Sequence, residues 1–214
     1  PTFLEAAGVA KLAPIMQPVS GRSLFDIFRS PKSGQVIASR DHVLIGKERH
    51  DIGRPNNWGY PIRGIVKDDQ LYLHNFKPDR WPGGNPETGY LNCDGSPAKS
   101  LILTQRREGT YHFWNLNFGK RVREELFELK GDADCVNNLA ESRPHAGLKA
   151  ALKEQLFAEL REQGDPRMFG KGDVFDNYPY SGESTDNFYR RYMGGEKIKA
   201  GWVRPTDFEK EKLD

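Results

Sequence analysis

The sequence lacks the features that mark several common classes of protein. It has only two cysteines, Cys93 and Cys135, and no C-x-x-C or Cys/His cluster. This pattern excludes a disulfide framework and argues against a structural zinc site. No apolar run approaches the ~18 residues that a transmembrane helix needs, so no membrane span is predicted.

An excess of one charge is also missing. The formal net charge is +2, from 32 Lys and Arg against 30 Asp and Glu, and the two signs are interleaved along the chain. Interleaved charge is typical of a solvated surface, so we expect no nucleic-acid partner. The 22 glycines and 14 prolines predict much loop, although 36% hydrophobic residues still allow a core.

Recognisable catalytic motifs are absent as well. The five histidines form no H-E-x-x-H or H-x-H pattern, and the chain has no G-x-S-x-G, P-loop or G-x-G-x-x-G motif. His74 alternates with Leu73 in a strand-like run, so we expect it to be structural and to lie on a solvated face. The chain itself therefore predicts no metal, cofactor or catalytic residue.

The first part of the chain predicts short elements. Residues 1–8 read as a helix, and residues 21–28 as a second helix capped by Ser23, with a Pro/Gly-rich loop between them. Strands are expected at 36–38 and at 42–45, the second one buried. Because a natural N-terminus rarely falls on a helix start, we expect the chain to be part of a longer protein.

The middle of the chain predicts a β-hairpin. Residues 60–66 and 71–76 alternate apolar and polar side chains around a turn at Asp68-Asp69, which indicates one solvated face. Residues 77–97 form a long polar loop, and loops of this length are usually functional or disordered.

The rest of the chain predicts four elements and a tail. They are a helix that starts at Ser96-Pro97 and runs through 100–107, a helical segment at 111–118, a strand at 125–129 and a helix at 147–163. Leucines recur every fourth residue from Leu148 to Leu160, so the last helix is expected to pack them into the core. Residues 165–214 have little hydrophobic periodicity and are expected to be an extended tail, lying over a partner surface or partly disordered. The predicted fold class is α+β, a small antiparallel sheet with a packed C-terminal helix and a long tail.

Two polar segments are candidate binding sites. The first is Glu48-Arg49-His50-Asp51, with Arg54 close behind. Arg and His would bind an anion while the carboxylates accept sugar hydroxyls. The alternative is a solvated charged loop that follows a strand.

The second segment is residues 75–82. Trp81 would stack on a sugar ring, and Lys77 or Arg80 would contact sulfate. The alternative is a surface loop anchored by a buried Phe76 and a half-buried Trp81.

Six short motifs point to a known family. They are PTFLEAAG at 1–8, GRSL at 21–24, ERHD at 48–51, GYPIRGI at 59–65, EELFEL at 124–129 and NNLA at 137–140. In this order, along nearly the whole chain, they resemble the C-terminal part of a type I, formylglycine-dependent sulfatase. The ERHD, YPIR and HNF segments resemble most closely the heparan N-sulfatase (N-sulfoglucosamine sulfohydrolase-like) members.

The resemblance implies an enzyme that hydrolyses sulfate esters or N-sulfates on a glycan. In that family the nucleophile is a formylglycine made within a C/S-x-P-x-R motif, and a calcium ion lies beside it on ligands from the N-terminal domain. Neither Cys93 nor Cys135 begins such a motif. Formylglycine and calcium are therefore expected only in the parent enzyme, and the isolated chain is expected to be inactive.

The resemblance also implies an organisation and a set of partners. Residues 1–46 would end the large alkaline-phosphatase-like domain, and residues 47–214 would form the C-terminal subdomain. Glu48, Arg49, His50, Asp51 and Arg54 would bind substrate. The implied partners are the N-terminal catalytic domain and a sulfated saccharide, in a periplasmic, extracellular or lysosomal location. Two alternatives stay open: a stand-alone carbohydrate-binding or interaction module, and a phosphoesterase-like relative.

Overall fold

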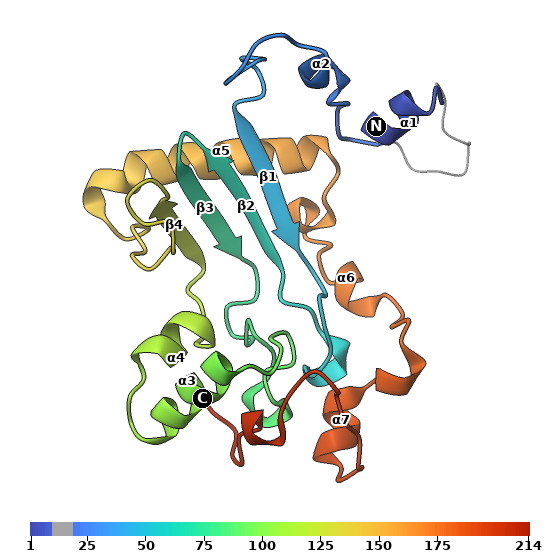
Figure 1. The fold of residues 1–214 in the computed structure, drawn as a ribbon, viewed down its shortest axis with the longest axis vertical. Coiled ribbons are helices and arrows are strands. Elements are labelled where there is room, and N and C mark those ends of the chain that lie inside the picture. The colour runs from blue at the N-terminus through green and yellow to red at the C-terminus, as the bar shows by residue number, and fades with distance from the viewer. Residues whose placement is uncertain (10–18) are drawn as a thin grey trace. The chain divides into compact units, whose positions relative to one another are not determined.

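The chain divides into two compact units, Pro1–Val43 and Leu44–Asp214. The computed structural model describes residues 1–9 and 19–214 (Figure 1). Most of the Pro/Gly-rich loop expected after the first helix lies outside these residues. The assignment of residues 1–46 to a larger domain stays a prediction.

The described part of the first unit contains two short helices, as predicted. They are α1 (Thr2–Ala6) and α2 (Phe25–Phe28). The Ser23 hydroxyl accepts the backbone N–H of Phe25 at 3.2 Å, at the start of α2. The strand expected at 36–38 is wrong, because these residues form bends and a turn. The Gln35 side-chain amide holds that turn by donating to two backbone carbonyls, Ile37 O at 2.8 Å and Arg40 O at 2.7 Å.

A four-stranded antiparallel sheet forms the centre of the second unit, which confirms the α+β class. In sheet order its strands are β1 (His42–Lys47), β2 (Ile62–Lys67), β3 (Gln70–Asn75) and β4 (Glu124–Glu128). Asp68 and Asp69 join β2 to β3 with φ values of 48° and 57°. Two left-handed residues make the type I′ turn whose twist suits a hairpin, so the predicted hairpin is confirmed.

Five helices belong to the second unit. They are α3 (Pro97–Arg107), α4 (His112–Asn117), α5 (Ala146–Glu162), α6 (Val174–Asn177) and α7 (Phe188–Met193). None of the helices in the described part of the chain is both long and apolar enough to cross a membrane.

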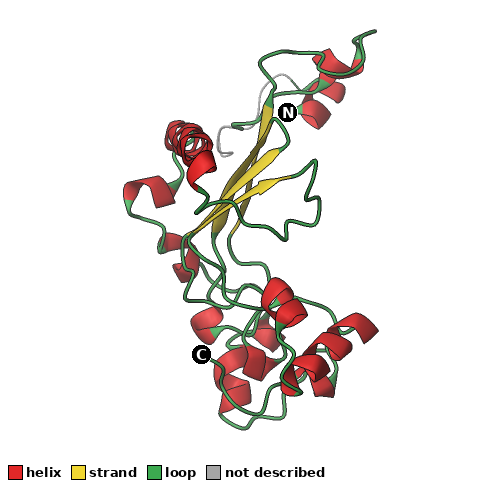
Figure 2. Cartoon of the chain, turned by 90° about the vertical axis from the view of Figure 1, so that its left-hand side faces the viewer, coloured by secondary structure: helices red, strands yellow, loops and turns green. Residues whose placement is uncertain are grey.

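Helix α5 covers one face of the sheet, and Figure 2 shows it end-on beside the strands. Its buried leucines Leu152, Leu156 and Leu160 pack against a cluster that includes Ile65 and Tyr72. Leu148 departs from the prediction, because 38% of it is exposed. The leucine stripe therefore enters the core one turn later than expected.

Strand β1 is at the edge of the sheet and is not the buried strand that its sequence predicts. Val43 is 60% exposed and Ile45 is 40% exposed. Leu44, between them, packs against the cluster under α5. Since α5 covers only one face, alternate residues of β1 point away from it.

The long loop at 77–97 is ordered, and part of it lies in the core. Thr88, Tyr90 and Leu91 are completely buried. Tyr90 belongs to a second core with Trp81 and three side chains of the α3–α4 region. Its polar composition did not indicate that it contributes to the core, because many of its polar groups form hydrogen bonds to other parts of the protein.

The tail is also folded, so the alternative of partial disorder is wrong. It carries α6, α7 and short 3₁₀ turns. Phe188 of α7 is fully buried in a third cluster with Ile52 and Leu91. Near the end, Asp207 pairs with Lys99 at 3.4 Å. Contacts such as these, between residues far apart in the sequence, anchor the tail along its length.

His74 is buried against α5, not on a solvated face. Its ring packs against Phe76 and Phe157, with centroids 4.7 and 5.2 Å apart, and only 7% of the residue is exposed. Burial first, and then the nearby Lys153, lower the pKa of His74 to about 4, while Glu124 opposes the shift.

This low pKa predicts loss of stability on acidification. Between the unfolded pKa of ~6.5 and about 4, the unfolded chain binds more protons than the native one. The free energy of unfolding therefore decreases as the pH is lowered through this range. Urea denaturation at pH 7, 5.5 and 4.5 should show this decline, and His74→Phe should flatten it. The exposed His112, replaced in the same way, is the control, and an unchanged slope in His74→Phe would contradict the prediction.

Candidate functional site

The loop after β1 places Glu48 inside an ion-pair cluster. Arg167 donates to both Glu48 oxygens at 2.6 Å, and Arg63 pairs with the same carboxylate at 2.7 Å. Arg63 also contacts Asp165 at 2.6 Å. The carboxylate of Glu48 is therefore already occupied by two guanidinium groups from distant parts of the chain.

Arg49 connects the same loop to the tail. Its guanidinium donates to the backbone carbonyls of Tyr178 at 3.0 Å and Asp176 at 3.2 Å. The Asp176 carboxylate in turn accepts two hydrogen bonds from Arg80, at 3.0 and 2.7 Å, and one from the Gly59 N–H at 3.2 Å. This segment of the tail thus holds the loop from one side.

Arg54 is a buried cation held by carbonyl oxygens. Only 1% of it is exposed. Its Nε donates to Trp81 O and its Nη2 to Pro82 O, each at 2.8 Å, and its Nη1 reaches Asn92 Oδ1 at 3.4 Å. No ion pair in the described ranges includes Arg54. Burial and the neighbouring Arg80 lower the pKa of Arg54 to about 10.

A cavity of about 300 Å³ lies beside this arginine. Its lining consists of Lys47, His50, Pro82, Gly83, Asn92, Cys93, Asn117 and Phe118. Pro82 and Asn92 also hold Arg54, so the guanidinium lies directly behind the wall. The lining contains one lysine, one histidine and no carboxylate.

Asp51 belongs to the same loop but not to the lining. Its Oδ1 accepts the N–H of Ile52 at 2.7 Å. Burial raises the pKa of Asp51, against the opposing effects of that N–H and of His50 and Arg54. Of the five predicted site residues, the structure brings His50 to the cavity, places Arg54 behind it and commits Glu48 and Arg49 to other contacts.

The second predicted segment is half-buried and is anchored in the core by Trp81. Trp81 is 6% exposed and packs edge-to-face on Trp114, with centroids 5.9 Å apart. Arg80 is paired with Asp176, and Lys77 contacts Asp173 at 3.3 Å. Trp81 is therefore an anchor, and its ring is not a platform for a sugar.

The sequence did not single out three lining residues. Lys47 ends β1, and Asn92 and Asn117 come from segments far along the chain. The position of Lys47 directly before Glu48 was the one available signal, whereas neither asparagine lies in a motif.

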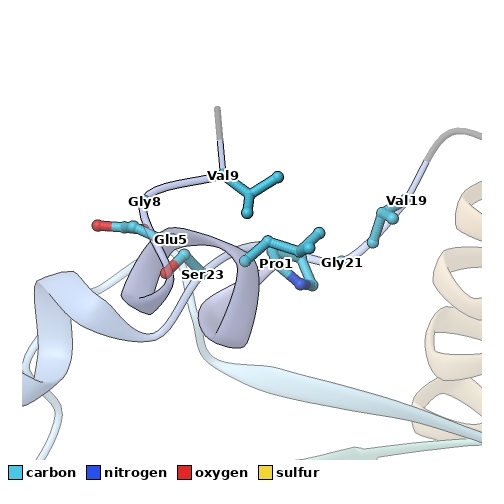
Figure 3. Close-up of a pocket in the computed structure, with 8 residues that line it drawn as sticks. Pro1, Glu5, Gly8, Val9, Val19, Gly21 and Ser23 are labelled. Carbon is cyan, nitrogen blue, oxygen red and sulfur yellow. The ribbon is translucent and has the colours of Figure 1, made fainter. Parts of the chain in front are cut away.

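The first unit has a separate pocket of about 530 Å³ with a different character (Figure 3). Its described lining is mostly apolar, and Glu5 is the one charged side chain in it. In residues 1–9 and 19–214, no group of three or more His, Cys, Asp or Glu could hold a metal ion.

Comparisons with known proteins give a partial structural match. No protein-family model matches the chain, and neither does any curated protein. The chain is structurally similar to parts of sulfatase structures. One is a "putative sulfatase" from Bacteroides thetaiotaomicron VPI-5482, with 18% identity and a TM-score of 0.39, over 78% of this chain and 24% of that one. Another is a 2-O GAG sulfatase, with 17% identity and a TM-score of 0.40, over 84% of this chain and 28% of that one. The chain thus spans about a quarter of the length of the structures it matches.

Proposed function

We propose that this chain is the substrate-side, C-terminal region of a formylglycine-dependent sulfatase that hydrolyses sulfate esters or N-sulfates on a glycan. The ordered series of six sulfatase-like motifs supports the family. The observation that carries the substrate-side role is the basic, carboxylate-free cavity beside the ERHD loop. Such a cavity suits a sulfated group, because positive side chains form strong charge-assisted hydrogen bonds to its oxygens.

The chain's own residues would bind and orient, while the covalent step would come from elsewhere in the parent protein. Calcium and formylglycine do not fit the residues present, since no described acidic or histidine cluster could hold the ion and neither cysteine begins the required motif. Lys47 and His50 would contact the anionic group. Glu48 and Arg49 would hold the loop in place. The partners would be the catalytic domain and a sulfated saccharide, outside the cytoplasm.

The upstream coding sequence gives the first test. A C/S-x-P-x-R motif there is expected, and its absence from an intact gene would overturn the proposal.

In the intact enzyme, His50→Ala is expected to raise KM for a sulfated oligosaccharide by about tenfold, because one charge-assisted hydrogen bond contributes roughly 1.5–3 kcal/mol. The formylglycine content, measured by mass spectrometry, should not change. His112→Ala, at another exposed histidine, is the matched control. A wild-type KM in His50→Ala would contradict the role of His50.

A further inference from the structure

The cavity at the end of β1 is lined by basic side chains and by no carboxylate. We propose that it is a binding site for a small tetrahedral oxyanion group, sulfate or phosphate, which Lys47 and His50 contact directly while Arg54 supplies fixed positive potential from behind. Identifying this group with part of a sulfated substrate rests on the proposed function. The site itself rests on the geometry alone.

Arg54 is the first element of the argument. A buried guanidinium is costly unless its charge is balanced. Here its donors are used on the oxygens of Trp81, Pro82 and Asn92, which fix its position but carry no formal charge. Asp51 interacts with this charge electrostatically without a direct ion pair, and an anion in the adjacent cavity would add balancing charge.

Lys47 is the second element. It lines the cavity, and its ammonium lies 5.7 Å from the centroid of the Tyr60 ring. No ion pair found in residues 1–9 and 19–214 includes Lys47. Burial first, and then Arg54, lower the pKa of Lys47. A bound anion would offset both effects, because it would stabilise the charged ammonium.

Asn92 is the third element. Its Oδ1 faces the guanidinium of Arg54, so its amide must present the NH₂ group elsewhere. That Nδ2 is buried and has no hydrogen-bond partner. A buried donor without an acceptor is uncommon in folded proteins, and this one belongs to a residue that lines the cavity.

The surroundings and the volume agree with this assignment. Asp51 interacts electrostatically with His50 and Arg54, but it is not part of the lining and its Oδ1 is engaged by the Ile52 N–H. A cavity of about 300 Å³ corresponds to roughly ten waters at ~30 Å³ each, which accommodates an oxyanion together with part of the group that carries it.

The test is an NMR titration of the 214-residue chain with sodium sulfate, inorganic phosphate and sodium acetate at constant ionic strength. Saturable shifts of the Asn92 side-chain amide and the His50 ring are expected with sulfate or phosphate. Lys47→Met keeps the aliphatic stem and should weaken binding at least about tenfold, the effect of losing roughly 1.4 kcal/mol. Lys47→Arg should restore most of it, and Lys130→Met, at an exposed lysine, should bind like the wild type.

Each outcome decides the proposal. The absence of saturable binding, or equal binding by the wild type and Lys47→Met, would overturn it. If Lys47→Met fails to fold, His50→Gln provides the same comparison at an exposed position. Tight sulfate binding together with an upstream gene that lacks C/S-x-P-x-R would keep this site and overturn the sulfatase function. An upstream C/S-x-P-x-R motif without saturable sulfate binding would keep the sulfatase assignment and overturn the site, together with the substrate-side role that it supports.

Discussion

Replacing Glu48 by alanine should destabilise the chain by about 2–4 kcal/mol, a value reduced for its partial exposure from the cost of breaking a fully buried ion pair. The side chain of Arg167 is only 3% exposed, and Glu48 is the carboxylate that pairs with it. Arg63 keeps its contact with Asp165 when Glu48 is removed. The main cost is therefore the stranded charge of Arg167.

Urea denaturation measures this loss, and Glu154→Ala on the exposed side of α5 is the matched control. Adding Arg167→Met to Glu48→Ala should recover part of the stability, because the stranded charge is then removed as well. Wild-type stability in Glu48→Ala would contradict this prediction.

Asp207→Ala should lower the free energy of unfolding by about 3 kcal/mol, because it also leaves a cation without its carboxylate, here in a more deeply buried pair. The side chains of Asp207 and Lys99 are 0% and 1% exposed, with Nζ and Oδ2 3.4 Å apart. The same Oδ2 accepts the N–H of Arg204 at 3.0 Å. The Lys99 ammonium would remain bonded to carbonyls such as Cys93 O at 2.6 Å, but its charge would be uncompensated.

Denaturation and limited proteolysis together test this prediction. The variant should unfold at lower urea and be cleaved sooner after α7, while Asp214→Ala, at the exposed C-terminus, should behave like the wild type. The double variant Lys99→Met with Asp207→Leu should be more stable than Asp207→Ala. Unchanged cleavage in Asp207→Ala would mean that the tail does not depend on this pair.

The elements with local causes were predictable from the sequence. The leucine spacing of α5, the Asp68-Asp69 turn and the Ser96 cap of α3 act within a few residues. Ser96 Oγ accepts the Lys99 N–H at 3.1 Å, as the Ser-Pro start of that helix indicates. Each of these signals specifies backbone geometry without help from distant segments.

The regions that the sequence misrepresented are held by distant partners. The loop at 77–97 looked like a polar surface segment because its own composition does not reveal Arg54, whose donors bind its carbonyls. The tail lacked periodicity because single long-range contacts, such as that of Asp207 with Lys99, order it instead of a repeated face.

The site shows the same limit. The sequence identified a charged loop but could not separate charges that are already paired from those that remain available. Glu48 is paired with a residue 119 positions away, whereas His50, two residues later, lines the cavity. The distinction comes from tertiary contacts and is invisible in the spacing of ERHD.

The ion-pair cluster around Glu48 also has a consequence for biosynthesis. The ribosome makes this loop before its partners: Arg167, which binds Glu48, and Tyr178, whose carbonyl holds Arg49, follow more than a hundred residues later. The loop cannot reach its native conformation until these residues have been synthesised, and synthesis proceeds at about 5–20 residues per second. A message truncated before these residues would give a product that contains the whole ERHD motif but lacks the partners that hold it in its native conformation.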